Sequence, residues 1–391
     1  MPPANLSRRQ FARRLGAGLG ATVLAGDLFR GVAHARQPKG VPPGVIQLNS
    51  NENPYGPSKR SQKAISSARR IAARYPDALE TEVMETIARL HSVSPEQVIL
   101  GCGSGEVLRM ADMAFLAPGQ NVVVANPTFE AVLAYARVTR AEPVQVPQTS
   151  DFRHDLPSMA AACSARTGLV YLCNPNNPTG TIVTRAEMDA FFARVPQTAT
   201  ILVDEAYHHF VEDPQYSSAF DWLPKAQNLV VVRTFSKVYG MAGMRLGYAV
   251  GSAERISTMR GHLIWNNGNA AVLEAALASL ADGNHVAHQR RLNNDLRRWL
   301  CAELERDARR YIPSHTNFVM IHLGRDVGPV IEEFRKRNIL IGRRFPSMSD
   351  WMRISIGTKK EMEAFVTALR RIVPVTAAGR AARVAEEERA A

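Results

Sequence analysis

The sequence predicts an α/β protein with a large domain, built on a mostly parallel sheet, and a smaller α+β domain toward the C-terminus. Continuous apolar runs that alternate with helical stretches are typical of parallel strands covered on both faces. Six such runs lie at residues 98–100, 121–125, 169–173, 200–203, 229–232 and 247–250. Polar motifs follow several of these runs, and ligands of parallel sheets gather at the carboxyl ends of the strands.

The pattern changes after about residue 270, which predicts the second domain. A long helical stretch from residue 270 to about 310 leads to apolar runs at 318–321, 339–341 and 351–356. A chain of 391 residues has room for both domains. The tail at 377–391 is mostly Ala, Arg and Glu, which predicts a frayed helix or a disordered segment.

The first 35 residues have the layout of an export signal. The pair Arg8-Arg9 precedes a moderately apolar, glycine-rich run at 15–25, and a small-x-small pattern ends at Ala35. This order predicts a secretory signal cleaved after Ala35, and the arginine pair resembles a bacterial twin-arginine (Tat) signal. The resemblance implies export by the Tat machinery to the periplasm after folding and cofactor loading. A basic, disordered N-terminus is the alternative.

Charge and cysteine content exclude some classes of function. The net charge is +12, of which residues 1–35 carry +4 through five arginines against one aspartate. Basic residues do not form a stripe with aromatic residues, so nucleic-acid binding is not predicted, and no apolar run predicts a permanent membrane span. The four cysteines show no CxxC or zinc spacing. We therefore predict no metal site and free, mostly buried thiols.

The segment around Lys237 carries the strongest chemical signal. An apolar run is followed by Thr234, Ser236 and Lys237, then by a glycine-rich turn and Arg245. A lysine that forms a Schiff base needs a buried, rigid position and a lowered amine pKa. The hydroxyls and Arg245 could bind a phosphate. Read alone, the segment is also compatible with a plain turn that carries incidental charges.

Two further motifs follow apolar runs. Asp204 closes one run and Tyr207 lies three residues later; a carboxylate at such a point can keep a pyridine nitrogen protonated. The proline- and asparagine-rich segment 174–180 is a tight turn whatever else it does, and Asn177 could present its amide to a cofactor. A solvated aspartate and a simple turn are the alternatives.

The glycine-rich segment 101–105 follows another run and opens a helical stretch. Glycines allow close approach of the backbone, and a helix N-terminus favours phosphate, although this pattern also occurs without nucleotide binding. Phe129, after the run at 121–125, could stack on a heterocycle or could pack in the core.

Together these segments resemble fold-type-I pyridoxal-phosphate (PLP) enzymes, and among them the histidinol-phosphate aminotransferase family. The segments 48–57, 74–77 and 316–319 extend the match, which spans roughly residues 45–370. The resemblance implies a seven-stranded, mostly parallel sheet in the large domain. It divides the chain into a signal at 1–35, an arm and part of the small domain at 36–70, the large domain at 71–270, the small domain at 271–375 and a tail at 376–391.

The resemblance implies roles for individual residues. Lys237 carries the cofactor as a Schiff base and moves the substrate proton, and Asp204 pairs with the pyridine nitrogen. The remaining cofactor contacts fall on Ser104, Gly105, Phe129, Asn177, Tyr207, Thr234, Ser236 and Arg245. Relatives often carry Asp or Asn where this chain has Gly105, which leaves a backbone contact with phosphate intact.

The resemblance also implies substrate contacts and a partner. Arg353 binds the acidic group of the substrate, Arg343 or Arg344 assists, and Asn53 lies at the substrate. Tyr55 reaches the cofactor phosphate of a second subunit, which implies a homodimer with shared active sites. The predicted reaction is ping-pong transfer of an amino group, from an amino acid or amino-alcohol phosphate to a keto acceptor.

Other reactions remain open. A PLP-dependent decarboxylase or lyase uses nearly the same residues, because the bond that breaks depends on substrate orientation. A non-catalytic binding protein would need neither Lys237 nor Asp204. A nicotinamide dehydrogenase would use segment 101–105 but leaves the Asp204 and Lys237 segments unexplained. Since histidine synthesis is cytoplasmic, the export signal predicts a different pathway for this chain.

Overall fold

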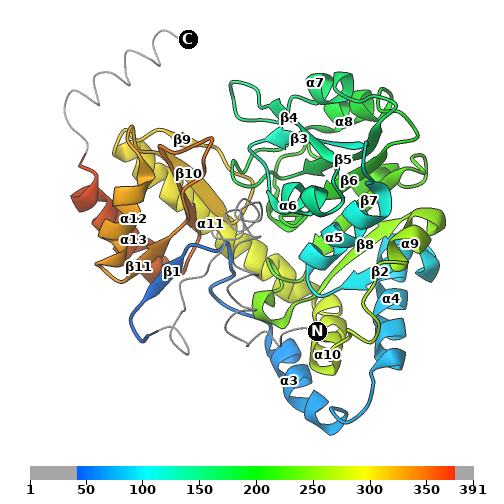
Figure 1. Cartoon of the computed structure of the whole chain (residues 1–391). Coiled ribbons are helices and arrows are strands. Elements are labelled where there is room, and N and C mark those ends of the chain that lie inside the picture. The colour runs from blue at the N-terminus through cyan, green and yellow to red at the C-terminus, as the bar shows by residue number, and fades with distance from the viewer. Residues whose placement is uncertain (1–41, 375–391) are drawn as a thin grey trace, which may run out of the picture. The chain divides into compact units, whose positions relative to one another are not determined.

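A seven-stranded sheet forms the centre of the computed structural model, which describes residues 42–374 (Figure 1). The sheet order is β2-β8-β7-β6-β5-β3-β4. The strands are β2 (Val98–Gly101), β3 (Asn121–Asn126), β4 (Glu142–Pro147), β5 (Thr167–Cys173), β6 (Thr200–Asp204), β7 (Leu229–Thr234) and β8 (Gly247–Gly251). The predicted signal at 1–35 and the tail at 376–391 lie outside the described residues.

The direction of the strands confirms the predicted mostly parallel sheet. Strands β4, β3, β5, β6 and β7 pair in parallel, and only β8 runs antiparallel to its neighbours β7 and β2. The six predicted strands are present. The edge strand β4 was not predicted, because its sequence contains Pro143 and Pro147, which normally argue against a strand. Proline lacks the N–H of a ladder bond and is tolerated at a sheet edge.

Helices cover both faces of this sheet. On one face, the apolar residues of β3, β5, β6 and β7 pack against α5 (Ser104–Phe115), α6 (Ala131–Val138) and α9 (Ala253–Arg260). On the other face, alternate residues of the same strands pack against α7 (Leu156–Ala161) and α8 (Arg185–Phe192). Burial on both faces explains why the strands are apolar throughout.

Further helices lie at the β2 end of the sheet. There α3 (Lys59–Ser67) packs beside α10 (Ala270–Leu280), and α4 (Asp77–His91) joins them. The helical stretch predicted from residue 270 to about 310 is divided into two helices. The first ends at Leu280, and α11 (Gly283–Arg306) starts anew because the Asp282 side chain accepts a hydrogen bond from the His285 N–H.

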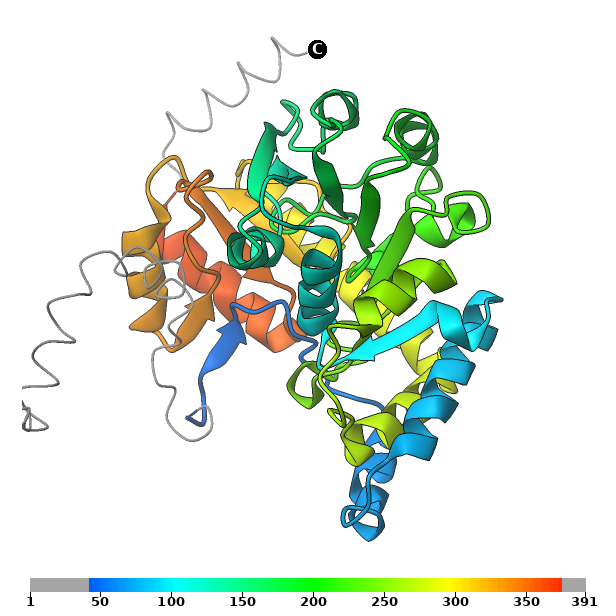
Figure 2. The ribbon, with the colours of Figure 1, turned by 45° about the vertical axis from the view of Figure 1, so that its right-hand side comes forward.

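The C-terminal residues form two small sheets, one of which includes the N-terminal strand. Strands β9 (Tyr311–Ile312), β10 (Phe318–His322) and β12 (Trp351–Ser355) are antiparallel, and β1 (Ile46–Leu48) pairs in parallel with β11 (Ile339–Ile341). Figures 1 and 2 show blue β1 beside orange β11. Helices α11, α12 (Val327–Arg335) and α13 (Lys359–Ile372) complete this core.

Two sequence expectations concern the whole described region. Within residues 42–374, no helix is long and apolar enough to cross a membrane. The four cysteines are free thiols, but the expectation that most are buried is wrong. Only Cys173 is buried, Cys102 is exposed, and Cys163 and Cys301 are partly exposed.

Candidate active site

The predicted site residues follow neighbouring parallel strands and therefore meet at one edge of the sheet. Asp204 is the last residue of β6, Asn177 lies four residues after β5, and Lys237 lies three residues after β7. The strand order β7-β6-β5 places these three ends side by side (Figure 1). This edge is where ligands of doubly wound sheets bind.

Lys237 lies in a partly enclosed position beside Tyr207. Its Nζ donates a hydrogen bond of 3.0 Å to the Asn51 carbonyl and lies 5.5 Å from the centre of the Tyr207 ring. Burial, reinforced by the positive charge of Arg353, lowers the pKa of Lys237 to about 8. A substantial fraction of the amine is therefore neutral near physiological pH, as a nucleophile or base requires.

Asp204 is only 2% exposed and is held at both carboxylate oxygens. The Ala206 N–H donates to Oδ1 at 3.0 Å, and the Tyr171 hydroxyl donates to Oδ2 at 3.1 Å. Burial raises the pKa of Asp204 to about 6, and the two hydrogen bonds act in the opposite direction. The carboxylate remains mostly ionised at neutral pH and has free lone pairs for a further donor.

Asn51 forms hydrogen bonds with several residues of the site, although the sequence carries no separate signal for it. Its carbonyl accepts hydrogen bonds from Lys237 and, at 3.0 Å, from the Asn317 amide. Its side-chain amide donates to the Tyr207 hydroxyl at 3.0 Å, and its backbone N–H donates to Ser355 Oγ at 2.8 Å. The positive φ of 54° lets Asn51 direct these groups to different elements.

A cradle for an anion forms where α5 begins. A Cβ built on Gly103 would lie 2.0 Å from Nη2 of Arg245, and one built on Gly247 would lie 2.3 Å from the Ser104 nitrogen. The φ of 76° at Gly103 favours glycine, and a side chain at 247 would clash with the backbone of Ser104, so both glycines keep the start of α5 open beside Arg245. A Cβ on Gly105 would meet only the Tyr135 hydroxyl at 3.8 Å, an ordinary contact.

The hydroxyls predicted to bind phosphate lie beside this cradle. Arg245 Nη1 donates to Ser236 Oγ at 3.4 Å, and Thr234 Oγ1 donates to Ser236 Oγ at 3.0 Å. A guanidinium, a helix N-terminus and hydroxyls form a donor set suited to a phosphate dianion. These residues fit the phosphate of the predicted cofactor, and Asp204 fits its pyridine nitrogen.

Arg353 is buried and faces Asn177. Its Nη1 donates to Asn177 Oδ1 at 2.7 Å and its Nη2 donates to the Asn49 carbonyl at 3.1 Å. The guanidinium carbon lies 5.5 Å from the centre of the Phe318 ring and 5.1 Å from that of the Phe345 ring. Burial lowers the pKa of Arg353 to about 10, so the cation persists at neutral pH. The buried Nε has no hydrogen-bond partner among the described residues, which leaves a donor for a ligand.

The two neighbouring arginines differ in their partners. Arg343 forms an ion pair with Glu130, the residue after Phe129, and lies 4.3 Å from the centre of the Phe345 ring. Arg344 instead pairs with Asp326 at 2.7 Å. Arg343 therefore shares the Phe345 ring with Arg353, whereas Arg344 is paired elsewhere.

Phe129 follows β3 and is exposed. The turn before it is tied to the turn at 174–180, because Thr128 Oγ1 donates to Asn176 Oδ1 at 2.8 Å and Asn176 Nδ2 donates to the Pro127 carbonyl at 3.2 Å. These bonds hold the turn of Phe129 beside that of Asn177. Stacking of Phe129 on a cofactor ring stays a prediction.

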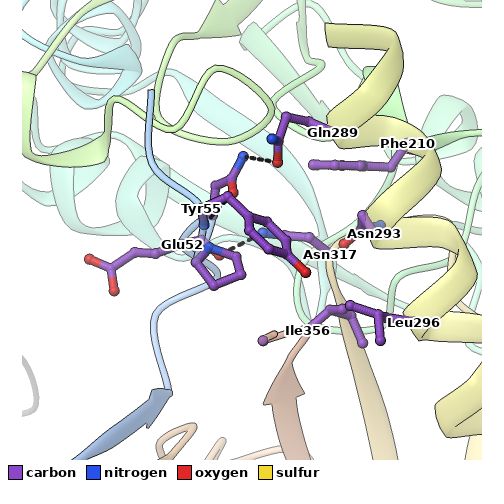
Figure 3. A pocket seen from close by; sticks show the side chains of 11 residues that line it. Glu52, Tyr55, Phe210, Gln289, Asn293, Leu296, Asn317 and Ile356 are labelled. Atoms are coloured by element: carbon purple, nitrogen blue, oxygen red, sulfur yellow. Dashed lines mark hydrogen bonds between the residues drawn. The ribbon is translucent and has the colours of Figure 1, made fainter. Parts of the chain in front are cut away.

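The arm residues Asn53 and Tyr55 lie beside α11. The Asn53 amide donates to the Val238 carbonyl and to Gln289 Oε1, and its oxygen accepts from the Tyr55 N–H. Tyr55 lines a pocket with residues of α11 such as Asn293 (Figure 3). Contacts within the chain thus occupy the Asn53 side chain, and its contact with substrate stays a prediction.

Glu205, which follows Asp204, belongs to the support of the site. Its carboxylate binds Arg233 at 2.7 Å and accepts hydrogen bonds from Ser218 Oγ and from the Ala219 N–H at 2.6 Å. All of these groups are buried or nearly so. This network joins the end of β6 to the end of β7, next to Asp204 and close to Lys237 in the sequence.

The arrangement combines an activated amine, a buried carboxylate, an anion cradle and a second cationic site at Arg353. A primary amine that is partly neutral can attack a carbonyl carbon or remove an activated proton. The carboxylate can stabilise a cationic heterocycle. Arg353 can bind a carboxylate or phosphate by two parallel hydrogen bonds.

Comparisons with known proteins match nearly the whole described chain. The model of the family described as aminotransferase class I and II matches residues 43–369. Histidinol-phosphate aminotransferase from Moorella thermoacetica is 37% identical over 332 residues, 84% of this chain and 86% of that protein. The same enzyme from Caldicellulosiruptor saccharolyticus is 34% identical over 331 residues, 84% of this chain and 92% of that protein.

A solved structure adds a cofactor to the comparison. Histidinol-phosphate aminotransferase from Sinorhizobium meliloti, in complex with pyridoxal-5′-phosphate, aligns with a TM-score of 0.79 at 25% identity. The alignment covers 84% of this chain and 90% of that chain.

Proposed function

Because this chain belongs to the aminotransferase class I and II family, we propose that it transfers an amino group by a ping-pong reaction from a small anionic amino donor to a keto acceptor. The chain is a PLP-dependent aminotransferase of fold type I. The observation that carries the finer proposal is the buried Arg353, whose Nη1 donates to Asn177 and whose buried Nε has no partner among the described residues.

Pyridoxal phosphate, when bound, supplies an electron sink conjugated to the substrate amine. The residues of the chain supply the rest. Lys237 would hold the cofactor and, as a free neutral amine, would take the proton from the substrate Cα and deliver it to C4′ of the cofactor. Asp204 would keep the ring nitrogen protonated, and Ser104, Ser236 and Arg245 would bind the phosphate.

The substrate carries a carboxylate or a phosphate that Arg353 recognises. Arg343 approaches the same aromatic ring as Arg353, so it assists with a second negative charge when it leaves Glu130. Histidinol phosphate is the first donor to test because the relatives carry that name, whereas the export proposed below favours a donor from another pathway. Other amino-alcohol phosphates and amino acids share the chemistry.

The test is a half-reaction with the holoenzyme. Candidate donors are added one at a time while the visible absorbance of the bound cofactor is recorded. Conversion to the amine form of the cofactor, with release of a keto product, supports the proposal and identifies the donor. Formation of an amine and carbon dioxide would instead assign a decarboxylase. Absence of a cofactor band even with added PLP would favour a binding protein.

The substitution Arg353→Lys is expected to raise the KM for an acidic donor by about 10- to 100-fold, because lysine keeps the charge but loses the planar fork. kcat should change less than KM. Steady-state kinetics with Arg335→Lys as a control measure this effect. Arg335 is an exposed arginine paired with Glu332, and its variant should match the wild type. An unchanged KM in Arg353→Lys would remove Arg353 from the substrate site.

The active enzyme is proposed to be a homodimer with shared sites. Trp265 is 89% exposed, Ile264 is 56% exposed and Tyr75 is 76% exposed. Gly268 lies against Pro76, so the segments of these side chains are neighbours. Large apolar side chains grouped on a surface are typical of a protein interface. Tyr55, 41% exposed, is the residue proposed to reach the cofactor phosphate of the other subunit.

The substitution Trp265→Asp is expected to shift the protein from dimer to monomer, because it buries a charge in the interface. Sedimentation of wild type and variant measures the mass. Leu90→Asp, another exposed apolar residue, is the control. A wild type that sediments as a monomer while fully active would contradict the dimer.

Export through the twin-arginine route, with cleavage near Ala35, is also proposed. The support is the order of Arg8-Arg9, the apolar run and the small residues before Ala35. Replacing Arg8 and Arg9 by lysine keeps the charge and should leave the precursor in the cytoplasm. Fractionation and immunoblotting measure its position. Mature protein in the periplasm of the double variant would exclude this route.

A further inference from the structure

Tyr171 lies on β5, below the carboxylate that faces the cofactor. β5 and β6 are neighbouring parallel strands in which Tyr171 pairs with Leu202 and Cys173 pairs with Asp204. Asp204 therefore lies two residues further along the sheet than the direct partner of Tyr171. The length of the phenol bridges this offset, and its hydroxyl donates to Asp204 Oδ2 at 3.1 Å.

We propose that Tyr171 is a positioning residue that fixes the orientation of the Asp204 carboxylate and favours its ionised form. This role rests on the pairing of Asp204 with the pyridine nitrogen. Tyr171 is 0% exposed and belongs to an apolar cluster with Leu202, Val230 and Val232. A phenylalanine would fill the same space in this cluster. The hydroxyl adds the hydrogen bond to Asp204.

The Tyr171 hydroxyl is the one side-chain donor to this buried carboxylate among the described residues. The other hydrogen bond that the Asp204 carboxylate accepts comes from the Ala206 backbone N–H to Oδ1. Burial raises the pKa of Asp204, Lys237 opposes the increase, and Glu205 adds to it. The neighbours Tyr171 and Cys173 stay protonated, because burial raises the pKa of both well above their usual range. A hydrogen bond to the ionised form lowers a pKa, so loss of the Tyr171 hydroxyl raises that of Asp204.

The test is Tyr171→Phe in the holoenzyme, with the pH dependence of kcat as the readout. The value of kcat at neutral pH is expected to fall about tenfold, as for loss of a hydrogen bond to a charged group. The decline of kcat on the acid side should begin at a higher pH than in the wild type. Tyr248→Phe is the matched control. It removes another buried hydroxyl of the same sheet, bonded to His91 at 3.0 Å, and should leave the pH profile in place.

A second readout does not depend on turnover. PLP is titrated into the apoenzyme across the same pH range, and its affinity should weaken on acidification as Asp204 is protonated. In Tyr171→Phe this weakening should begin at higher pH. In an Asp204→Asn background, Tyr171→Phe should cause no further shift in either readout, because the titrating partner is absent.

The outcomes separate the inference from the proposed function. A wild type without cofactor absorbance or transamination would refute the proposed function. An active wild type together with a Tyr171→Phe variant whose pH profiles coincide with the wild-type profiles would overturn the role of Tyr171 alone. An equal shift in Tyr248→Phe would overturn it as well, since a general effect on the sheet would then explain both.

Discussion

Replacing Lys237 by alanine is expected to lower kcat by about 10⁴-fold or more and to abolish the visible band of the lysine-bound cofactor. The amine is the only group of the described site that is placed to act as both nucleophile and base. Its pKa near 8 keeps part of it neutral at working pH. Lys237→Arg keeps the positive charge and should be equally inactive.

The control is Lys225→Ala, which removes an exposed lysine. Its turnover and absorbance should equal those of the wild type. The rates are measured with saturating donor and acceptor, and the absorbance with added PLP. Turnover in Lys237→Ala comparable to wild type would falsify the central assignment.

The same variant makes a prediction about the stability of the apoenzyme. The folded pKa of about 8 lies below the ordinary value of 10.5, so between these values the unfolded chain binds more protons than the folded chain. The free energy of unfolding of the wild type should therefore rise with pH across this window. Lys237→Ala should lack this rise. Denaturant titrations from pH 7 to pH 11 compare the two slopes.

Much of the fold could be predicted because the buried strands are apolar throughout and are separated by helices. Asp204, Asn177 and Lys237 each follow such a strand, so their common location at one sheet edge follows from the strand directions. Pro143 and Pro147 concealed β4, because prolines normally argue against a strand. The break between α10 and α11 was missed because the sequence has a helical pattern on both sides of it, and only the cap at Asp282 marks the start of the second helix.

The parts of the site that could not be predicted depend on contacts between distant segments. The hydrogen bonds of the Asn51 side chain and backbone reach across 156 residues to Tyr207 and 304 residues to Ser355. No local spacing encodes such pairs. Tyr171 resembled an ordinary strand residue, and only the register of β5 against β6 brings its hydroxyl to Asp204.

Replacing Asp204 by alanine is expected to weaken the affinity for PLP but to leave it bound at saturating cofactor, and to lower kcat by about 10³-fold, the magnitude found when a preorganised electrostatic partner is removed. The phosphate cradle at Gly103, Ser104 and Arg245 does not involve this carboxylate, which is why the cofactor should remain.

Asp204→Asn refines the test, because asparagine nearly preserves the shape and removes only the charge and its titration. Burial raises the pKa of Asp204 to about 6, and a protonated ring nitrogen beside it would lower that pKa. The wild-type kcat should therefore decline on the acid side, below about pH 6, as Asp204 is protonated, and Asp204→Asn should lose this limb of the profile while keeping a low, flat rate. Asp221→Asn, which removes an exposed aspartate paired with Arg185, should retain the wild-type profile. If Asp204→Asn kept both the rate and the acid limb, the ring nitrogen would have to be protonated by another group. The buried carboxylate would then join Glu205 as part of the supporting network.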